Sequence, residues 1–246
     1  MTESRTVLIT GGAGGIGRGI AAAFLEAGDR VVLADVDEAS VTSAAAEIGA
    51  AAVVVDIKDA AAVARCLEQV EREHGAVDVL VNNAGILSVH GSVTELDADA
   101  YRSIIDVNIV GTFNMTQAVA KRLIARGRGG AIVNISSIGG RQPTPGMGAY
   151  ESSKAAVDSI TRWAAIELAG NGIRVNAVAP GPVLTPMLAM GMPEGSPARA
   201  AWTSRIPLGK LADVDDIAPA VVFLAGASAG HITGVSLAVD GGQLLT

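Results

Sequence analysis

A tyrosine and a lysine stand four residues apart in the stretch GAYESSKAA, which begins at Gly148. On a helix this spacing is about one turn, so Tyr150 and Lys154 would lie on the same face. A tyrosine with the unperturbed pKa of about 10 is a poor base at neutral pH, but a nearby ammonium group favours the phenolate and lowers that pKa. The pair therefore predicts proton transfer to or from one bound molecule. The plainer interpretation is a surface aromatic beside a solvated charge.

A glycine-rich turn, TGGAGGIG at 10–17, lies where the first strand-like run meets the first helical pattern. Glycines there let a pyrophosphate approach the amides at a helix N-terminus, where unpaired N–H groups and the helix dipole favour an anion. A purely structural turn is the alternative, because such a turn alone is weak support. The residues of the turn that we predict to bind a cofactor are Gly11, Gly14, Gly15, Ile16 and Gly17.

An acidic residue, Asp35, ends the second strand-like run, twenty residues after Gly15. A carboxylate at that point can accept hydrogen bonds from the ribose hydroxyls of adenosine and would repel a 2′-phosphate. A basic residue at the position of Gly14 could have bound a 2′-phosphate, so the glycine there also favours NAD over NADP. The alternative for Asp35 is an N-cap of the helix predicted from near Asp37. Asp56 ends the third run at the same edge and could meet the adenine amino group.

Short β-branched runs alternate with longer alanine-rich amphipathic segments along the whole chain. This alternation predicts right-handed βαβ crossovers, and therefore an α/β protein with a doubly wound Rossmann fold, a seven-stranded parallel sheet and helices on both faces. We expect a single domain over 1–246. The predicted strands are 5–10, 30–35, 51–56, 77–83, 130–136, 173–180 and 235–241. The predicted helices are 15–28, 37–48, 59–75, 97–126, 149–170 and 213–226.

One stretch, 181–212, breaks this alternation and holds five of the nine prolines. A connection of this length is more typical of a flap over a site than of a simple loop, so we predict a substrate flap over about 186–212. Its large apolar side chains could line a substrate pocket or only pack the flap onto the body, because methionine suits both uses. These side chains are Met187, Met190, Met192 and Trp202.

The composition excludes several classes of protein. Half of the 246 residues are hydrophobic and 17% are charged, which suits a sheet buried on both faces together with a subunit interface. The net charge of -7 argues against general binding to nucleic acid. The single cysteine, Cys66, excludes an intramolecular disulfide, and the three histidines lack metal-ligand spacing, so we expect no metal. With no signal-peptide pattern and no apolar stretch near the roughly 20 residues that span a bilayer, we expect a cytoplasmic protein with no membrane contact.

With these residues in view, the sequence resembles the short-chain dehydrogenase/reductase family over essentially its full length. Any one of the shared motifs could occur by chance, whereas seven in register are highly specific. In chain order they are TGGAGGIG at 10–17, Asp56, NNAG at 82–85, Asn108 within DVNIVGTF, NISSIGG at 134–140, YESSK at 150–154 and PGPVLT at 180–185.

The resemblance implies that Asn108, Ser137, Tyr150 and Lys154 form the catalytic set. The family's usual spacing before the tyrosine selects Ser137 over its neighbour Ser136. Tyr150 would exchange the proton with the substrate oxygen while Ser137 hydrogen-bonds that oxygen. Lys154 would also anchor the nicotinamide ribose, so that Tyr150 and Lys154 contact the cofactor as well, and Asn108 would hold a water that passes the proton to solvent.

The resemblance also implies cofactor contacts from later segments. Asn83, Ala84 and Gly85 would line the cofactor cleft, and Val183 and Thr185 would hold the nicotinamide carboxamide. The remaining predicted contacts are Ile57, Pro180 and Gly181. Family members are commonly homotetramers, and the small-residue helix faces of this chain permit the close packing that a homotetramer requires.

The predicted function is hydride transfer between NAD(H) and a small-molecule secondary alcohol or ketone. One alternative is an NADPH-dependent 3-oxoacyl-type reductase, but that branch of the family usually carries an arginine where Gly14 stands and no acid at Asp35. The other alternative is a nucleotide-sensing protein that kept the fold and lost turnover. The intact serine, tyrosine and lysine set argues against it.

Overall fold

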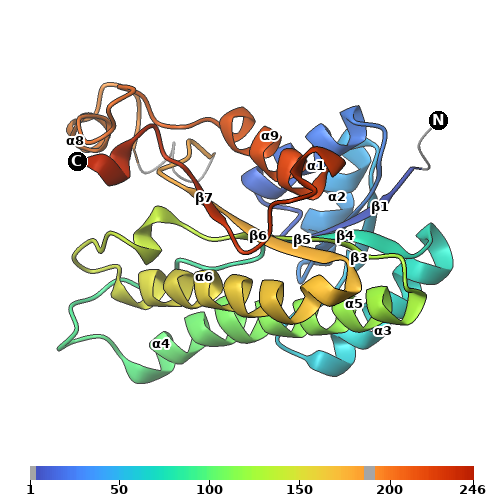
Figure 1. The fold of residues 1–246 in the computed structure, drawn as a ribbon. Helices are drawn as coiled ribbons and strands as arrows, with labels where there is room; N and C mark the ends of the chain where they lie inside the picture. The colour runs from blue at the N-terminus through green and yellow to red at the C-terminus, as the bar shows by residue number, and fades with distance from the viewer. Residues whose placement is uncertain (1–3, 186–191) are drawn as a thin grey trace.

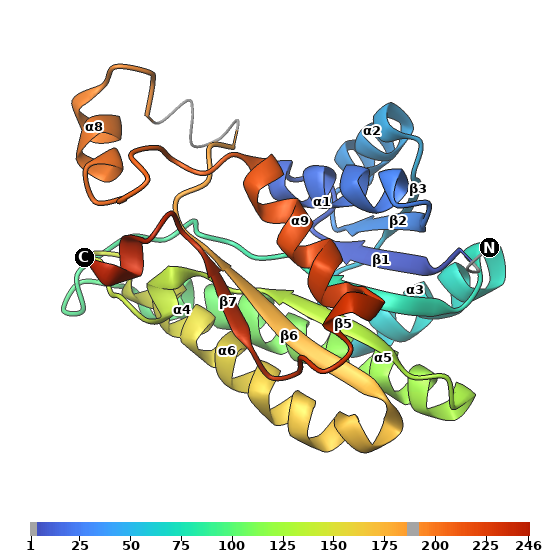
Figure 2. The ribbon, with the colours of Figure 1, turned by 45° about the horizontal axis from the view of Figure 1, so that its top comes forward.

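The computed structural model describes residues 4–185 and 192–246. Seven strands form one parallel sheet in the order β3-β2-β1-β4-β5-β6-β7 (Figures 1 and 2). The predicted fold class is therefore confirmed, and each strand lies within two residues of its predicted limits. The strands are β1 (Thr6–Thr10), β2 (Arg30–Asp35), β3 (Ala51–Val54), β4 (Val77–Asn82), β5 (Gly130–Ile135), β6 (Ile173–Pro180) and β7 (Ser236–Val239).

Helices cover both faces of this sheet. Figure 1 shows α1, α2 and α9 on one face and α3, α5 and α6 on the other. The longer helices are α1 (Gly15–Glu26), α2 (Glu38–Ile48), α3 (Ala60–His74), α4 (Ala98–Ile105), α5 (Thr112–Arg126), α6 (Gly148–Leu168), α8 (Pro197–Thr203) and α9 (Val214–Ala225).

Each face of the sheet has its own apolar core. Along β1, Val7 and Ile9 pack with α1, α2 and α9, whereas Leu8 between them packs with α3, α5 and α6. All three side chains are fully buried, because successive residues of a strand point to opposite faces and both faces are covered. This two-sided burial explains why the sequence of each strand is a continuous apolar run.

Within the part of the chain that the structure describes, no helix combines the length and the apolar character needed to cross a membrane.

The segment predicted as one helix over 97–126 is interrupted. Between α4 and α5 lies a π-helical turn, η1 (Asp106–Gly111), which widens the helix by one residue. The Thr112 hydroxyl donates to the backbone carbonyl of Asn108 (2.8 Å), and Gly111 packs so tightly that a Cβ there would lie 2.5 Å from Ile57 Cδ1. The prediction of a continuous helix was wrong, because the apolar periodicity of the sequence continues across a single inserted residue and gives no sign of it.

The segment after β6 leaves the sheet and returns to the same place. The backbone amide of Leu184 donates to Ala212 O (2.7 Å), and the amide of Ala212 donates to Pro182 O (3.1 Å). Between these ends lies α8, which Ser196 caps by accepting from the amide of Arg199. The predicted flap is thus anchored at both ends beside the carboxyl edge of the sheet.

The apolar residues of the predicted flap lie partly outside the described residues. Met187 and Met190 lie outside the described residues. Trp202 stacks beneath the Arg205 guanidinium, whose carbon is 5.1 Å from the ring centroid. This contact holds the indole within the flap itself, and the assignment of Trp202 and Met192 to a substrate pocket stays a prediction.

Candidate active site

The predicted site residues follow the carboxyl ends of neighbouring strands. β1 ends at Thr10, β4 at Asn82 and β5 at Ile135. The order of strands reverses between β1 and β4. In a doubly wound sheet, the crevice outside the carboxyl ends at such a reversal is where ligands bind.

The glycine-rich turn between β1 and α1 is held by the end of β4. Gly11 has a φ of +63°, which favours glycine, and a Cβ there would lie 2.7 Å from the Ala84 Cα. A Cβ at Gly17 would collide with the Gly11 carbonyl oxygen. Asn83 Nδ2 donates to Thr10 O (3.0 Å) and Gly11 O (2.9 Å). Asn83, predicted as a cofactor contact, therefore shapes the turn that would cradle the cofactor.

The N-terminus of α1 is left open for an anion. Gly14 is its N-cap and supplies no side-chain hydrogen bond, and the first turn, which begins at Gly15, carries no acidic side chain. Ile16 packs partly buried against the core below. Since the first amides of a helix lack intrahelical acceptors, these residues fit the pyrophosphate of a dinucleotide.

The structure separates two interpretations of the acid after β2. Asp37, not Asp35, is the N-cap of α2, and its carboxylate accepts from the Ser40 amide (3.2 Å). Asp35 instead accepts from the amides of Ala13 (3.2 Å) and Val36 (2.8 Å). The capping alternative for Asp35 is wrong, and its carboxylate lies fixed against the glycine-rich turn.

Asp56 and Ile57 follow β3 on a loop, since that strand ends two residues earlier than predicted. Asp56 is partly exposed and accepts from the Lys58 amide (3.0 Å), while the Lys58 ammonium lies 3.5 Å from its carboxylate. The buried Ile57 side chain packs against Gly111 of the π-helical turn. Asp56 is therefore the polar member of this pair that a ligand could reach.

Tyr150 and Lys154 lie on one face of α6, as their spacing predicts. Lys154 Nζ is 5.5 Å from the centroid of the Tyr150 ring and donates to Ile135 O at the end of β5 (2.8 Å). Lys154 is buried. A Cβ at Gly140 would lie 2.8 Å from the Ala155 amide, so the small residues around this helix allow the neighbouring loop to pack against it.

The two adjacent serines after β5 face different ways. Ser137 is hydrogen-bonded to the Tyr150 side chain, and its Oγ also accepts from the Gly139 amide (3.1 Å). Ser136 is buried and donates to Lys154 O (3.1 Å). The serine beside the tyrosine is therefore Ser137, the one that the family spacing selects.

Asn108 is buried and its amide is fully engaged. Its Oδ1 accepts from the Ile86 amide (2.8 Å), and its Nδ2 donates to Ile86 O (3.1 Å) and Ser153 Oγ (2.9 Å). Gly85 lies between Asn108 and Lys154. A Cβ at this position would be 3.3 Å from both Asn108 Oδ1 and Lys154 Nζ, so a glycine lets both side chains pack closely against the backbone. Asn108 thus ties the segment after β4 to α6.

Burial dominates the electrostatics of the tyrosine and lysine. Desolvation raises the pKa of Tyr150, the hydrogen bond with Ser137 opposes that shift, and the nearby Glu151 carboxylate adds to it. Desolvation lowers the pKa of Lys154 to about 8, against the opposing attraction of Asp158. The lowering of the tyrosine pKa that the lysine neighbour predicts is therefore not the dominant effect, because desolvation of the phenol is the largest influence on the pKa of Tyr150.

The segment after β6 places the remaining predicted contacts at the same edge. Pro180 ends β6, and the Gly181 amide donates to Val239 O (3.0 Å). Val183 is buried in the core, and the Thr185 amide donates to the Val183 carbonyl oxygen (2.8 Å).

Several buried polar residues near the site were missed at the sequence level. Glu151 accepts from the Thr144 amide with both carboxylate oxygens (2.9 Å each) and so fastens the loop before α6. Asn134 accepts from Asn82 Nδ2 (2.8 Å) and donates to Thr161 Oγ1 (2.8 Å). Asn82 also donates to Thr116 Oγ1 (3.0 Å) and so links β4 to α5. Asn134 could have been recognised in the sequence as a polar residue inside an otherwise apolar strand.

The described residues contain no group of three or more His, Cys, Asp or Glu that could hold a metal ion.

Comparison with known proteins agrees with this geometry. A family model described as enoyl-(acyl carrier protein) reductase matches residues 11–243. The chain is 36% identical to the sorbitol dehydrogenase of Cereibacter sphaeroides and 38% identical to the galactitol 2-dehydrogenase of Agrobacterium fabrum, with 99% of each chain covered. A short-chain type dehydrogenase/reductase from Mycobacterium ulcerans has a similar structure, with a TM-score of 0.94, 32% identity and coverage of 99% of this chain and 90% of that one. The chain belongs to the short-chain dehydrogenase/reductase family.

As a short-chain dehydrogenase/reductase, the chain is an oxidoreductase of a family that binds nicotinamide cofactors. The N-terminus of α1, which has no side-chain cap hydrogen bond, and the crevice at the strand reversal fit such a cofactor.

Proposed function

We propose that this chain interconverts a secondary alcohol and its ketone with NAD(H), with Tyr150 as the acid and base. The observation that carries the proposal is the convergence of Ser137, Tyr150 and Lys154 beside Gly85 in buried surroundings. When bound, the oxidised cofactor accepts the hydride that leaves the carbinol carbon. Each turnover converts alcohol and NAD+ into ketone, NADH and one proton.

The side chains act at the substrate oxygen. Ser137 donates a hydrogen bond that holds this oxygen in line, and Tyr150 takes its proton during oxidation or returns it during reduction. Lys154 uses one N–H on Ile135 O, which leaves two donors for the tyrosine and the nicotinamide ribose. Asn108 acts as a positioning residue through Ile86 and Ser153, and its role in holding a water stays a prediction.

For the substrate we propose a polyol or a related small secondary alcohol, because two relatives of matching length are named for their action on sorbitol and galactitol. Initial rates with these polyols, simple cyclic alcohols and a 3-oxoacyl thioester, each with both cofactors, would test this choice. Turnover of the thioester with NADPH alone would favour the reductase alternative, which also has a relative of matching length, the 3-oxoacyl-[acyl-carrier-protein] reductase of Thermotoga maritima. Binding of NADH without turnover of any compound would favour the silent sensor.

The preference for NAD rests on Asp35 and its surroundings. Asp35 faces the glycine-rich turn through the Ala13 amide. One basic candidate for a 2′-phosphate, Arg18 on α1, is already paired with Glu47. A 2′-phosphate would thus meet one carboxylate and a neutralised guanidinium, which disfavours NADP.

Asp35→Ser is expected to lower kcat/KM for NAD+ by about 10- to 100-fold, the effect of losing charge-assisted hydrogen bonds to a ribose, and to raise kcat/KM for NADP+. Steady-state kinetics with both cofactors measures the change. Asp37→Ser is the matched control, since serine preserves the cap of α2 and the carboxylate two residues away is retained. A wild-type enzyme that uses NADP+ at least as well as NAD+ would contradict this assignment.

We also propose a homotetramer. Trp163 stacks on Phe113 with ring centroids 5.9 Å apart, yet 47% of Trp163 and 80% of Ile166 are exposed on the outer side of α5 and α6. An exposed apolar surface of this kind is typical of an interface. Light scattering at micromolar concentration should give four times the chain mass, and Ile166→Glu should shift it towards smaller species. A monomeric wild type would contradict the proposal.

A further inference from the structure

A buried carboxylate that the proposed chemistry does not use lies one helical turn beyond Lys154. Asp158 is on α6, four residues after the lysine, so the two side chains lie on the same face of the helix. Only 7% of the Asp158 side chain is exposed, although aspartate is rarely buried unless it is paired. Lys154 therefore has Tyr150 one turn before it and a buried carboxylate one turn after it.

Two groups outside α6 hold this carboxylate. Ser236 Oγ on β7 donates to Asp158 Oδ1 (2.8 Å), and Arg141 Nε in the loop after β5 lies 3.5 Å from Oδ2. Arg141 Nη2 also donates to Ser236 O (2.6 Å). The plainer interpretation is that Asp158 only fastens this loop to β7. The ion pair is long, however, and its guanidinium is 35% exposed, so solvent screens it and it neutralises the carboxylate only in part.

The Lys154 ammonium needs an opposing charge. Burying an ammonium group is costly unless an anion compensates it. Lys154 is buried, and the acceptor of its hydrogen bond, Ile135 O (2.8 Å), is a neutral carbonyl. Burial lowers the pKa of Lys154 to about 8, and the attraction of Asp158 acts against this lowering. The carboxylate thus acts on the lysine although it is bonded to other groups.

Other charged side chains on α6 and on the elements packed against it do not replace Asp158. Several are exposed to solvent, namely Asp99, Arg102, Asp106, Lys121, Arg162 and Glu167. The half-buried arginines of α5 and β6 bond to groups outside α6, and these are Arg122, Arg126 and Arg174. Glu151 accepts from the Thr144 amide with both carboxylate oxygens. Among the described residues, the charge that supports the buried ammonium is therefore that of Asp158.

We propose that Asp158 is a positioning residue that holds the Lys154 ammonium charged and in place within the site. Ser236 and Arg141 fix the carboxylate, and its charge acts on the lysine across one helical turn. Without this charge the lysine would release its proton at a lower pH, and its attraction for a tyrosine phenolate would weaken. The consequence for turnover rests on the proposed function of Lys154, whereas the interaction of the two charges does not.

A double-mutant cycle, measured by chemical denaturation at one fixed protein concentration, tests the interaction. Asp158→Asn keeps the shape of the side chain and an acceptor for Ser236 but removes the charge. At pH 7 it should raise the unfolding equilibrium constant about three- to tenfold more in the wild type than in the Lys154→Met background, as expected for two charges one turn apart. At pH 10, where the folded protein holds Lys154 neutral, the two increases should agree within about twofold. Equal increases at pH 7 would overturn the proposal.

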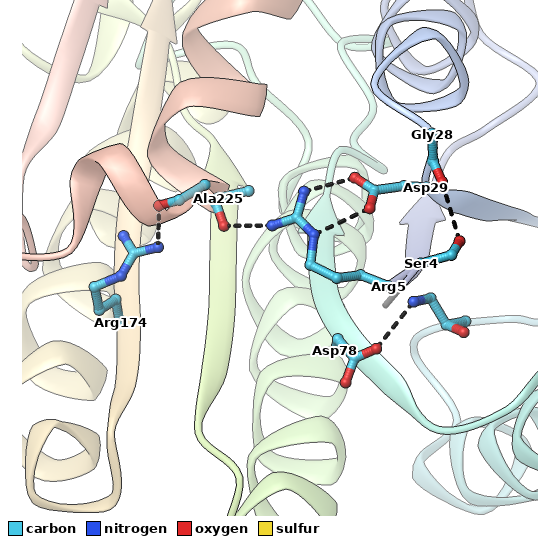
Figure 3. Close-up of polar contacts among 9 residues, drawn as sticks. Ser4, Arg5, Gly28, Asp29, Asp78, Arg174 and Ala225 are labelled. Carbon is cyan, nitrogen blue, oxygen red and sulfur yellow. Dashed lines mark hydrogen bonds and ion pairs between the residues drawn. The ribbon is translucent and has the colours of Figure 1, made fainter. Parts of the chain in front are cut away.

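Asp29 provides the matched control. Its side chain is 8% exposed and also pairs with an arginine, Arg5, just before β1 and β2 at the amino-terminal edge of the sheet (Figure 3). Arg5 donates in addition to Ala225 O (2.8 Å), at the end of α9. Asp29→Asn should raise the unfolding constant by the same factor in the wild type and in the Lys154→Met background at both pH values. A larger factor in the wild type would overturn the proposal, because the coupling would then not report a local pair of charges.

The cycle also decides the case in which Asp158→Asn does not fold. Lys154→Met removes the ammonium that has lost its support, so the double variant should then regain the circular dichroism of the wild type. A double variant that also fails to fold would show that Asp158 serves only its contacts with Arg141 and Ser236, and would overturn the proposal.

The pH profile of kcat tests the consequence for turnover. Lys154 should be charged at pH 6 with or without Asp158, so Asp158→Asn should keep kcat within about twofold of the wild type there and lower it about three- to tenfold at pH 8. A purely structural role would lower kcat by the same factor at both pH values, and that result would overturn the role in turnover. A wild type that oxidises no alcohol would contradict the proposed function, and the denaturation cycle would still decide whether Asp158 supports Lys154.

Discussion

Replacing Tyr150 with phenylalanine is expected to lower kcat for alcohol oxidation with NAD+ by about 10³-fold, within the range typical of a lost general acid and base. The substitution removes only the hydroxyl that bonds to Ser137 and leaves the ring beside Lys154. The KM for NAD+ should therefore change little, and kcat and kcat/KM should fall together. Steady-state kinetics with the best alcohol of the substrate panel, together with a fluorescence titration of NADH, measures both effects.

The chain offers a matched control, because it contains only one other tyrosine. Tyr101 is on α4, partly exposed, with its hydroxyl 3.2 Å from Ser152 Oγ. Tyr101→Phe also removes one phenolic hydroxyl and should keep kcat within about twofold of the wild type. A Tyr150→Phe variant with wild-type kcat would exclude Tyr150 as the acid and base. A variant that no longer binds NADH would show that the hydroxyl serves binding instead.

The fold could be predicted from the sequence because burial on both faces leaves a direct pattern. The run from Thr6 to Thr10 has no polar residue facing a solvated side, and the whole strand is buried. Alternation of such runs with helices fixes a parallel sheet, and its handedness follows from the crossover rule. The spacing of Tyr150 and Lys154 was predictable for the same reason, since both lie within a single regular helix.

Features that depend on one hydrogen bond or one inserted residue were not predictable. Asp35 and Asp37 are both plausible caps by position, and only the contact with Ser40 shows that Asp37 is the cap. The π-helical turn at Asn108 depends on the close approach of Gly111 to Ile57, two segments that are far apart in the sequence. Arg5, Arg30 and Arg174 are far apart in the sequence and meet at the amino-terminal edge of the sheet only because the strands begin side by side.

The protonation of Tyr150 and Lys154 depends on their burial, and burial cannot be predicted from the spacing of the two residues in the sequence. The four-residue spacing predicts that Lys154 lowers the pKa of Tyr150, whereas in the structure desolvation raises the pKa of the phenol and lowers that of the amine. Burial shifts both groups towards the neutral form for the same physical reason, although a lysine with a pKa of about 8 is still mostly charged at pH 7. We infer that a low pKa of the tyrosine requires the positive charge of the oxidised nicotinamide in addition to the lysine.

Lys154→Met is expected to have two opposite effects. It should lower kcat by about 10² to 10⁴-fold, because the proposed tyrosine chemistry loses its ammonium neighbour and the nicotinamide ribose loses an anchor. At the same time it should stabilise the unliganded protein at pH 7. Lys154 is buried with a pKa of about 8 in place of 10.5, so the folded state holds its proton less tightly than the unfolded state does.

The sign of the pH dependence follows from this difference. Between pH 8 and pH 10.5 the unfolded chain binds more protons at Lys154 than the folded chain, so wild-type stability rises with pH across this window. Below pH 8 the penalty is fully present and amounts to about 3 kcal/mol. Methionine removes this penalty but leaves Ile135 O without its donor, which costs about 1 kcal/mol. The net gain should be about 2 kcal/mol at pH 7 and should vanish by about pH 10.

Chemical denaturation of the unliganded protein at pH 7 and pH 10, at one fixed protein concentration because assembly also contributes to stability, measures this change. Lys121→Met is the control, since Lys121 is exposed on α5 and bonds only to Gln117 among the described residues. Its stability should differ little from the wild type at either pH. A Lys154→Met variant that is less stable than the wild type at pH 7, or whose advantage is the same at both pH values, would contradict a desolvation penalty on the buried ammonium. The contact of Lys154 with Ile135 O and the attraction of Asp158 would then outweigh the cost of burying the charge.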